Sequence, residues 1–230
     1  MYFYYLQKRD NTASMCRSRQ TNPTGNVLSD EEVNRLMKLA EDRDIPLIID
    51  NAYGEPFPNI IFTETRPVWN RNVIYCMSLS KVGLPGTRTG IVIADEAVIH
   101  LIRNMNAIIN LATANFGSMI ARDLISSGEI LRLSQLQIKP YYEAKVKHAV
   151  EILQRELDRT NYFIHRPEGA IFLWLWLPDL PVSDIVFYER LKQQGVLVLP
   201  GSHFFPGLEQ DDWEHKQQCI RITYSMDEQV

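Results

Sequence analysis

Short runs of apolar residues, each bounded by polar or turn-forming residues, predict strands in the first half of the chain. "IPLIID" (45–50), "NVIYCMS" (72–78) and "GIVIAD" (90–95) are continuous apolar runs rather than alternating ones. Continuous runs of this length are typical of strands that are covered on both faces of a sheet. We therefore expect three buried strands in this part of the chain.

Helical patterns separate and follow these runs. Ser29 and Glu32 form an S-x-x-E capping box before an apolar stripe that begins at Val33, so a helix should start there. Further helices are expected over 96–112 and, as a long amphipathic segment, from about 130 to 159. Strands that alternate with helices indicate an α/β fold with a mainly parallel sheet.

The last third of the chain predicts a smaller α+β domain. "AIFLWLWL" (170–177) is the longest apolar run, which suits a buried strand and is too short to cross a membrane. Ser183 and Gly195 should begin and end a helix. "VLVLPG" (196–201) and "CIRITYS" (219–225) are expected to be short strands.

Composition and charge narrow the class of protein. The 230 residues are 45% hydrophobic and carry a net charge of −4 without a block of lysines or arginines. Neither nucleic acid nor an anionic membrane surface is therefore expected as a partner. Cys16, Cys76 and Cys219 are widely spaced without a C-x-x-C pair. This pattern is typical of free thiols in a reducing compartment, so we expect a cytoplasmic protein without a metal site.

Polar residues that follow the predicted strands are candidates for a ligand site, because sites in α/β proteins form beyond the carboxyl ends of strands. Asp50 ends the first strand, where an ionised carboxylate needs a donor or a cationic partner. Taken alone, Asp50 is more simply explained as the cap of a turn. Asn22 opens the sequence "NPTG", which forms either a plain β-turn or a turn that presents an amide to a ligand.

The segment "SLSK" (78–81) carries two hydroxyl groups and an amine. On an extended segment, Ser78 and Ser80 would point the same way and could face one anion. Lys81 would be a reactive amine if its apolar setting disfavours the charge, and otherwise an ordinary surface lysine. Arg88 offers a fork for phosphate or carboxylate, or a surface ion pair. As S-x-x-K, the segment also fits a serine acyl-enzyme, but the S-D-N and K-T-G elements of that class are absent from the sequence.

Together, in this order and spacing, "NPTG", "DNAYG" and "SLSKVGLPGTRTG" resemble the active-site signature of the class I/II aminotransferases, which are fold-type-I enzymes dependent on pyridoxal 5'-phosphate (PLP). The resemblance covers nearly the whole chain. It implies that 1–142 is the C-terminal part of the PLP-binding large domain and that 143–230 is an incomplete small domain. It also implies amino-group transfer between an aliphatic α-amino acid, of the valine or alanine type, and a 2-oxo acid, in a homodimer.

The resemblance also implies roles for individual residues. Lys81 matches the lysine that holds PLP covalently and then moves a proton between the substrate Cα and the cofactor. Asp50 matches the carboxylate that pairs with the pyridinium nitrogen, while Tyr53 and Asn22 match the groups that contact the phenolic oxygen of the ring. The remaining matches are Ser78, Ser80 and Arg88 for the phosphate, Arg221 for the substrate α-carboxylate, and Gly169 where the backbone approaches the substrate.

The chain departs from the family pattern in two respects. The spacing from Lys81 to Arg88 is one residue shorter than in many family members. Only 21 residues precede Asn22, where family members carry a long segment that completes the phosphate site and supplies an aromatic residue over the pyridine ring. The alternative to an active enzyme is therefore a truncated, catalytically inactive remnant that lacks part of the cofactor site.

Overall fold

The computed structural model describes residues 4–7, 13–112, 114–208 and 210–226, with the backbone alone for 4–7 and 13–18. The chain divides into two compact units, and each is described separately. Unit 1 comprises Met1–Gln20 and Val27–Pro140, and unit 2 comprises Thr21–Asn26 and Tyr141–Val230. The domain boundary expected after residue 142 stays a prediction. No helix in the described ranges combines the length and the apolar character that crossing a bilayer requires.

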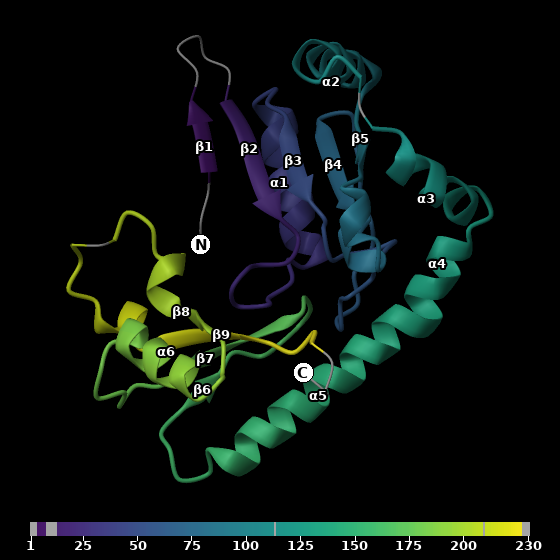
Figure 1. Ribbon diagram of the computed structural model, residues 1–230. Helices are drawn as coiled ribbons and strands as arrows, with labels where there is room; N and C mark the ends of the chain where they lie inside the picture. Colours follow the sequence, from purple (N-terminus) through teal and green to yellow (C-terminus); the bar gives the residue numbers. More distant parts are fainter. Residues whose placement is uncertain (1–3, 8–12, 113, 209, 227–230) are drawn as a thin grey trace. The chain divides into compact units, whose positions relative to one another are not determined.

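Unit 1 is built on a five-stranded sheet with the order β1-β2-β3-β4-β5 (Figure 1). β2, β3 and β4 run parallel, whereas β1 and β5 pair antiparallel with their neighbours at the two edges. The expected α/β fold is confirmed, and the sheet is mixed because its edge strands reverse direction. The strands are β1 (Tyr4–Gln7), β2 (Ala13–Ser18), β3 (Leu47–Asp50), β4 (Val73–Ser78) and β5 (Gly90–Ile93).

The continuous apolar pattern of β5 predicted a buried strand, and this prediction was wrong. Val92 and Ile93 expose 38% and 46% of their surface. β5 is an edge strand of this sheet, and the other elements in the described part of the chain leave most of its side chains accessible. The apolar residues of β5 are therefore more exposed than their sequence pattern predicts.

The predicted helices of unit 1 are present, and α3 (Phe116–Ser126) is a further helix that the sequence analysis missed. The capping box before α1 is confirmed, because Ser29 Oγ accepts from Glu32 N at 3.2 Å and Glu32 Oε2 accepts from Ser29 N at 2.8 Å. The predicted long helix is interrupted by a π-helical turn at Ser134–Ile138. The helices are α1 (Asp30–Asp42), α2 (Glu96–Ile109), α3 (Phe116–Ser126), α4 (Glu129–Leu133) and α5 (Lys139–Glu156), of which α5 continues into unit 2.

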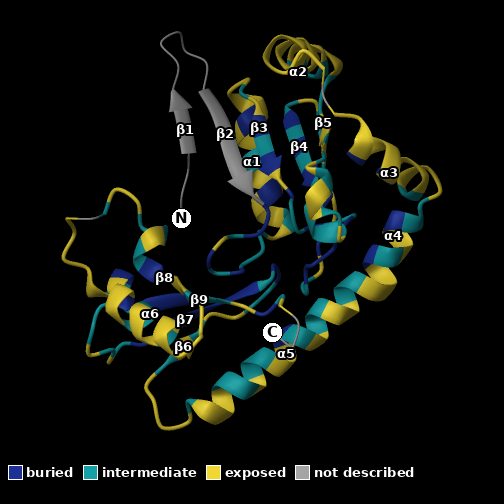
Figure 2. Ribbon diagram, viewed as in Figure 1, coloured by how far each residue is buried: buried dark blue, intermediate teal, exposed yellow. Residues whose placement is uncertain are grey.

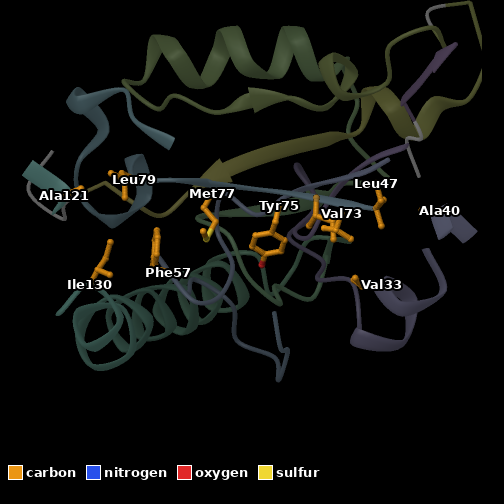
Figure 3. Packing of buried hydrophobic residues seen from close by; sticks show 11 residues of the cluster. Val33, Ala40, Leu47, Phe57, Val73, Tyr75, Met77, Leu79, Ala121 and Ile130 are labelled. Carbon is orange, nitrogen blue, oxygen red and sulfur yellow. The ribbon is translucent and has the colours of Figure 1, made fainter. Parts of the chain in front are cut away.

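The core of unit 1 lies between α1 and the sheet. Val33 and Ala40 of α1 pack in one cluster with Leu47 of β3 and with Val73 and Tyr75 of β4 (Figure 3). Alternate residues of β3 and β4 contribute to this cluster, since successive side chains of a strand point to opposite faces. The two strands that precede the candidate site are therefore anchored by the best-packed part of the unit.

Unit 2 contains a four-stranded antiparallel sheet with the order β6-β7-β9-β8. Leu175 and Ile220 form its core with Phe187 of the helix α6 (Asp184–Gln193). Ser183 caps this helix as predicted, by accepting from Val186 N. The strands are β6 (Phe163–Ile164), β7 (Phe172–Trp176), β8 (Leu199–Pro200) and β9 (Cys219–Thr223), and the short 3₁₀ turns are η4 (Gly201–Phe204) and η5 (Glu214–Gln217).

Replacing Leu47 with alanine should destabilise unit 1, because this side chain is fully buried between α1 and the sheet. We expect Leu47→Ala to lower the free energy of unfolding by about 2–5 kcal/mol in urea denaturation followed by far-ultraviolet circular dichroism. The matched control is Leu39→Ala on α1, where the leucine is 41% exposed; it should change the free energy by less than about 0.5 kcal/mol. Equal losses for the two variants would contradict the described core.

Candidate active site

The chain leaves β3 through a tight turn that carries Asp50 and Tyr53. Asp50 is exposed, and its Oδ1 accepts from Ala52 N at 3.2 Å. Asp50 thus caps the turn, which is the simpler of the two explanations that the sequence offered for it. The buried Asn51 donates from Nδ2 to the carbonyl of Glu55 at 2.6 Å. A Cβ at Gly54 would lie 1.9 Å from Asn51 Oδ1, so only glycine fits there. These local contacts fix the backbone on both sides of Tyr53.

The chain leaves β4 by turning at once into a 3₁₀ helix, η1 (Ser80–Val82). Ser80 N donates to Ser78 Oγ at 3.2 Å. Leu79 is fully buried in the core of unit 1 and so fixes the start of the turn. The expectation that Ser78 and Ser80 lie on one extended segment was therefore wrong, because the Ser78 hydroxyl satisfies the first free amide of the turn. The two serines are nevertheless brought together by this hydrogen bond.

Lys81 lies in the middle of η1 and is half-buried. Its Nζ is 5.5 Å from the centre of the Tyr53 ring, within the range of a cation–π contact. This contact connects the end of β4 with the end of β3, which are parallel neighbours with Asp50 opposite Cys76. Lys81 and Tyr53, which are far apart in the sequence, therefore meet beyond the carboxyl ends of two neighbouring strands.

Arg88 returns to the same group directly after a second 3₁₀ helix, η2 (Pro85–Thr87). It has a left-handed backbone with φ 48°, and its Nη1 donates to Ser80 Oγ at 3.4 Å. The guanidinium and the serine hydroxyls therefore converge on one side of η1. A cation beside hydroxyl groups is a donor set that suits a phosphate. The structure thus brings together Ser78, Ser80, Lys81, Arg88 and Tyr53, with Asp50 at the end of the neighbouring strand.

Unit 2 contains a second group of polar residues around Arg221. This arginine is on β9, where it pairs with Trp174 of β7 and Leu199 of β8. Its Nη1 donates to Asn22 Oδ1 at 2.6 Å. The oxygen of the Asn22 amide thus accepts from Arg221, and its Nδ2 group is the donor of the same amide.

The "NPTG" turn that carries Asn22 is supported by the segment around Gly169. Gly25 has φ +73°, and its carbonyl accepts from Glu168 N at 3.1 Å. A Cβ on Gly25 would lie 3.2 Å from the Gly169 carbonyl oxygen. Gly169 therefore contacts the turn through its backbone, while its expected approach to a substrate stays a prediction.

Two aromatic residues at Arg221 were missed by the sequence analysis. The guanidinium carbon of Arg221 lies over the Phe172 ring at 4.8 Å and over the Phe204 ring at 5.1 Å. Phe172 could have been found, because the period of two on β7 places it on the same face as Trp174, which is opposite Arg221. Phe204 lies in the 3₁₀ turn η4 after the short strand β8, and no periodic sequence pattern in this turn predicts its position.

Comparison with known proteins identifies this fold as that of an aminotransferase. The family model for class I and II aminotransferases matches residues 10–230, and the chain belongs to this family. It is 51% identical over 222 residues to the valine–pyruvate aminotransferase of Escherichia coli (strain K12), which covers 96% of this chain and 53% of that protein.

A solved structure of another valine–pyruvate aminotransferase is also similar to this chain. The valine–pyruvate aminotransferase of Salmonella typhimurium LT2 is 46% identical and superimposes with a TM-score of 0.85, over 99% of this chain and 62% of that one. The chain therefore spans between about half and three fifths of the length of these two relatives.

The turn that carries Phe204 depends on Gly201, because a Cβ there would lie 2.5 Å from the Cys219 carbonyl oxygen on β9. We expect Gly201→Ala to destabilise the protein by about 1–3 kcal/mol in urea denaturation followed by tryptophan fluorescence. Gly86→Ala is the control, since nothing lies within 4 Å of a Cβ at that position. If both variants were equally stable, the close approach of η4 to β9 would be refuted.

Proposed function

We propose that this chain carries the catalytic lysine and the substrate-carboxylate arginine of a PLP-dependent aminotransferase. The reaction moves an amino group between an aliphatic α-amino acid, of the valine or alanine type, and a 2-oxo acid such as pyruvate or 2-oxoisovalerate. The contact of Lys81 with Tyr53, beside a serine–arginine group at the ends of two parallel strands, carries the proposal. The two valine–pyruvate aminotransferases support the choice of substrates.

The residues after β3 and β4 fit the chemistry of PLP. When bound, PLP supplies an electrophilic carbon and a ring that withdraws electrons from the substrate. Arg88, Ser78 and Ser80 would hold its phosphate, because a guanidinium and two hydroxyl groups converge there. Asp50 would accept a hydrogen bond from the protonated ring nitrogen, since its exposed carboxylate lies at the end of the neighbouring strand.

Lys81 would serve in two ways. Its Nζ would hold the cofactor covalently before the amino acid binds, and afterwards the freed amine would take the proton from the substrate Cα and return it at another carbon. The Tyr53 ring and the 3₁₀ turn restrict the positions that Nζ can reach, because the turn is capped by Ser78 and anchored by Leu79. A base transfers a proton efficiently only if it is held in a defined position relative to the reacting carbon.

Arg221 would bind the α-carboxylate that amino acids and 2-oxo acids share. An arginine can donate two parallel hydrogen bonds to a carboxylate, which fixes the orientation of the substrate as well as its position. Asn22 holds one nitrogen of the fork through its amide oxygen, and its Nδ2 group would donate to the phenolic oxygen of the cofactor ring. In a homodimer, as is expected for this family, each subunit would carry one such set of residues.

Borohydride reduction of the purified chain mixed with PLP tests the role of Lys81. Reduction makes the bond between PLP and an amine irreversible, so a phosphopyridoxyl group should be found by peptide mapping on Lys81. Lys81→Ala should lose this label and the visible absorbance of bound PLP. Lys147→Ala, which removes an exposed lysine of α5, should keep both. Labelling of other lysines while Lys81 stays unmodified would refute the assignment.

A second candidate function is that of a catalytically inactive remnant that exists as part of an assembly. It is favoured by the apolar surface of α2 and α3, which Figure 2 shows mostly as exposed. None of the residues of α2 is buried, and Ile108 is 84% exposed. Other exposed apolar residues of this surface are Leu101, Met105, Ile109, Leu111, Phe116 and Met119. Exposed apolar surface of this kind often marks a site of association.

Light scattering after size-exclusion chromatography tests the assembly, which a homodimeric enzyme also requires. The borohydride label on Lys81 then separates the two candidates, since the inactive remnant should not acquire it. The chain is expected to elute as a dimer or a larger species, because burial of the α2–α3 surface removes apolar area from water. Ile108→Lys together with Met105→Lys should shift the population toward the monomer. A monodisperse wild-type monomer that unfolds cooperatively would exclude the assembly.

A further inference from the structure

We propose, building on the proposed role of Arg221, that Phe172 and Phe204 are positioning residues that hold its guanidinium ready to bind a substrate carboxylate. The guanidinium carbon lies 4.8 Å and 5.1 Å from the centres of the two rings. Both distances are within the roughly 6 Å range of a favourable cation–π contact. One residue comes from β7 and the other from η4, so two separate segments converge on one cation.

The Phe172 ring is fixed by the sheet itself. Phe172 is buried and lies on β7, which pairs with β9 along its whole length. Arg221 is two positions before the β9 residue opposite Phe172, Thr223. Residues two apart lie on the same face of a strand, so this ring and the arginine share one face of the sheet.

The Phe204 ring is fixed by the anchoring of η4. Ser202 N donates to the buried Asp184 carboxylate at 2.7 Å, and Gly201 packs directly on Cys219. Trp174 meets the Phe204 ring edge-to-face, with centres 5.6 Å apart and planes at 86°. Edge-to-face contact is a favoured geometry for two aromatic rings. The turn is therefore held by hydrogen bonding, by close backbone packing and by a ring contact.

The consequence for binding follows from the shape of a guanidinium. Its N–H donors lie in its plane, whereas aromatic rings stack on its faces, so ring contacts leave the edges for hydrogen bonds. Asn22 already holds Nη1 on one edge. An arginine held in this way loses little conformational freedom when a carboxylate arrives, and preorganisation of this kind increases affinity. The apolar rings also exclude water, which strengthens charge–charge attraction.

The test measures carboxylate binding at Arg221 directly, without requiring a cofactor or a turnover. The full chain is treated with phenylglyoxal, which modifies accessible arginines, and the Arg221 peptide is quantified by mass spectrometry with increasing 2-oxoisovalerate. We expect 2-oxoisovalerate to protect Arg221. In Phe204→Leu the concentration that gives half protection should rise about tenfold, a value within the range of cation–π energies.

Two further variants separate positioning from packing. Phe204→Tyr keeps the ring and should restore half protection to within about twofold of the wild type. Phe187→Leu removes a half-buried ring from the core of unit 2 and should leave the protection of Arg221 unchanged. If Phe204→Leu does not fold, as judged by thermal melting, Phe204→Met takes its place as the variant without a ring.

The outcomes distinguish the two levels of the proposal. If 2-oxoisovalerate protects Arg221 equally well in the wild type and in Phe204→Leu, the positioning role is overturned while the carboxylate-binding role of Arg221 stands. If it fails to protect Arg221 in the wild type, both are overturned. A tenfold shift that also occurs in Phe187→Leu would mean a general effect of packing and would likewise overturn the positioning role.

Discussion

The parallel pairing of β3 with β4 is the constraint on which the candidate cofactor site depends. Asp50 and Cys76 are opposite each other in this register, so both strands end at the same edge of the sheet. The turns that follow then place Tyr53 and Lys81 in contact. A shift by one residue would turn every side chain of β3 to the other face and expose Leu47. The packing of α1 on these strands therefore also fixes the register of the site.

The group around Arg221 is built on a different principle. Antiparallel pairing of β7 with β9 brings Trp174 opposite Arg221, and β8 leads directly into η4. The arginine thus receives aromatic neighbours from both sides of its strand. Lys81 lies in a short turn and contacts one ring, whereas Arg221 lies on a strand and contacts two rings and an amide.

The sequence predicted most helices and strands, but few of the side-chain contacts that form the candidate site. The cap at Ser29, the strand that ends at Asp50 and the helix that begins at Ser183 could be predicted, because their signals are local. The turn at Ser80 could not, since a hydroxyl of the preceding strand caps it, and Phe204 could not, since its role arises only when η4 folds against β9. Resemblance to a family located the polar residues, but it did not indicate which rings hold them.

The apolar pattern of β5 and α2 predicts more cover than the described residues supply, and relatives of this chain are considerably longer. The turns of the candidate site do not depend on this cover. Asn51 bonds to Glu55, and Ser80 bonds to Ser78, each within a few residues along the chain. Both turns directly follow strands that pack in the core between α1 and the sheet. The proposed binding of a phosphate near Lys81 and the proposed association through α2 therefore rest on different residues, and a change in one need not alter the other.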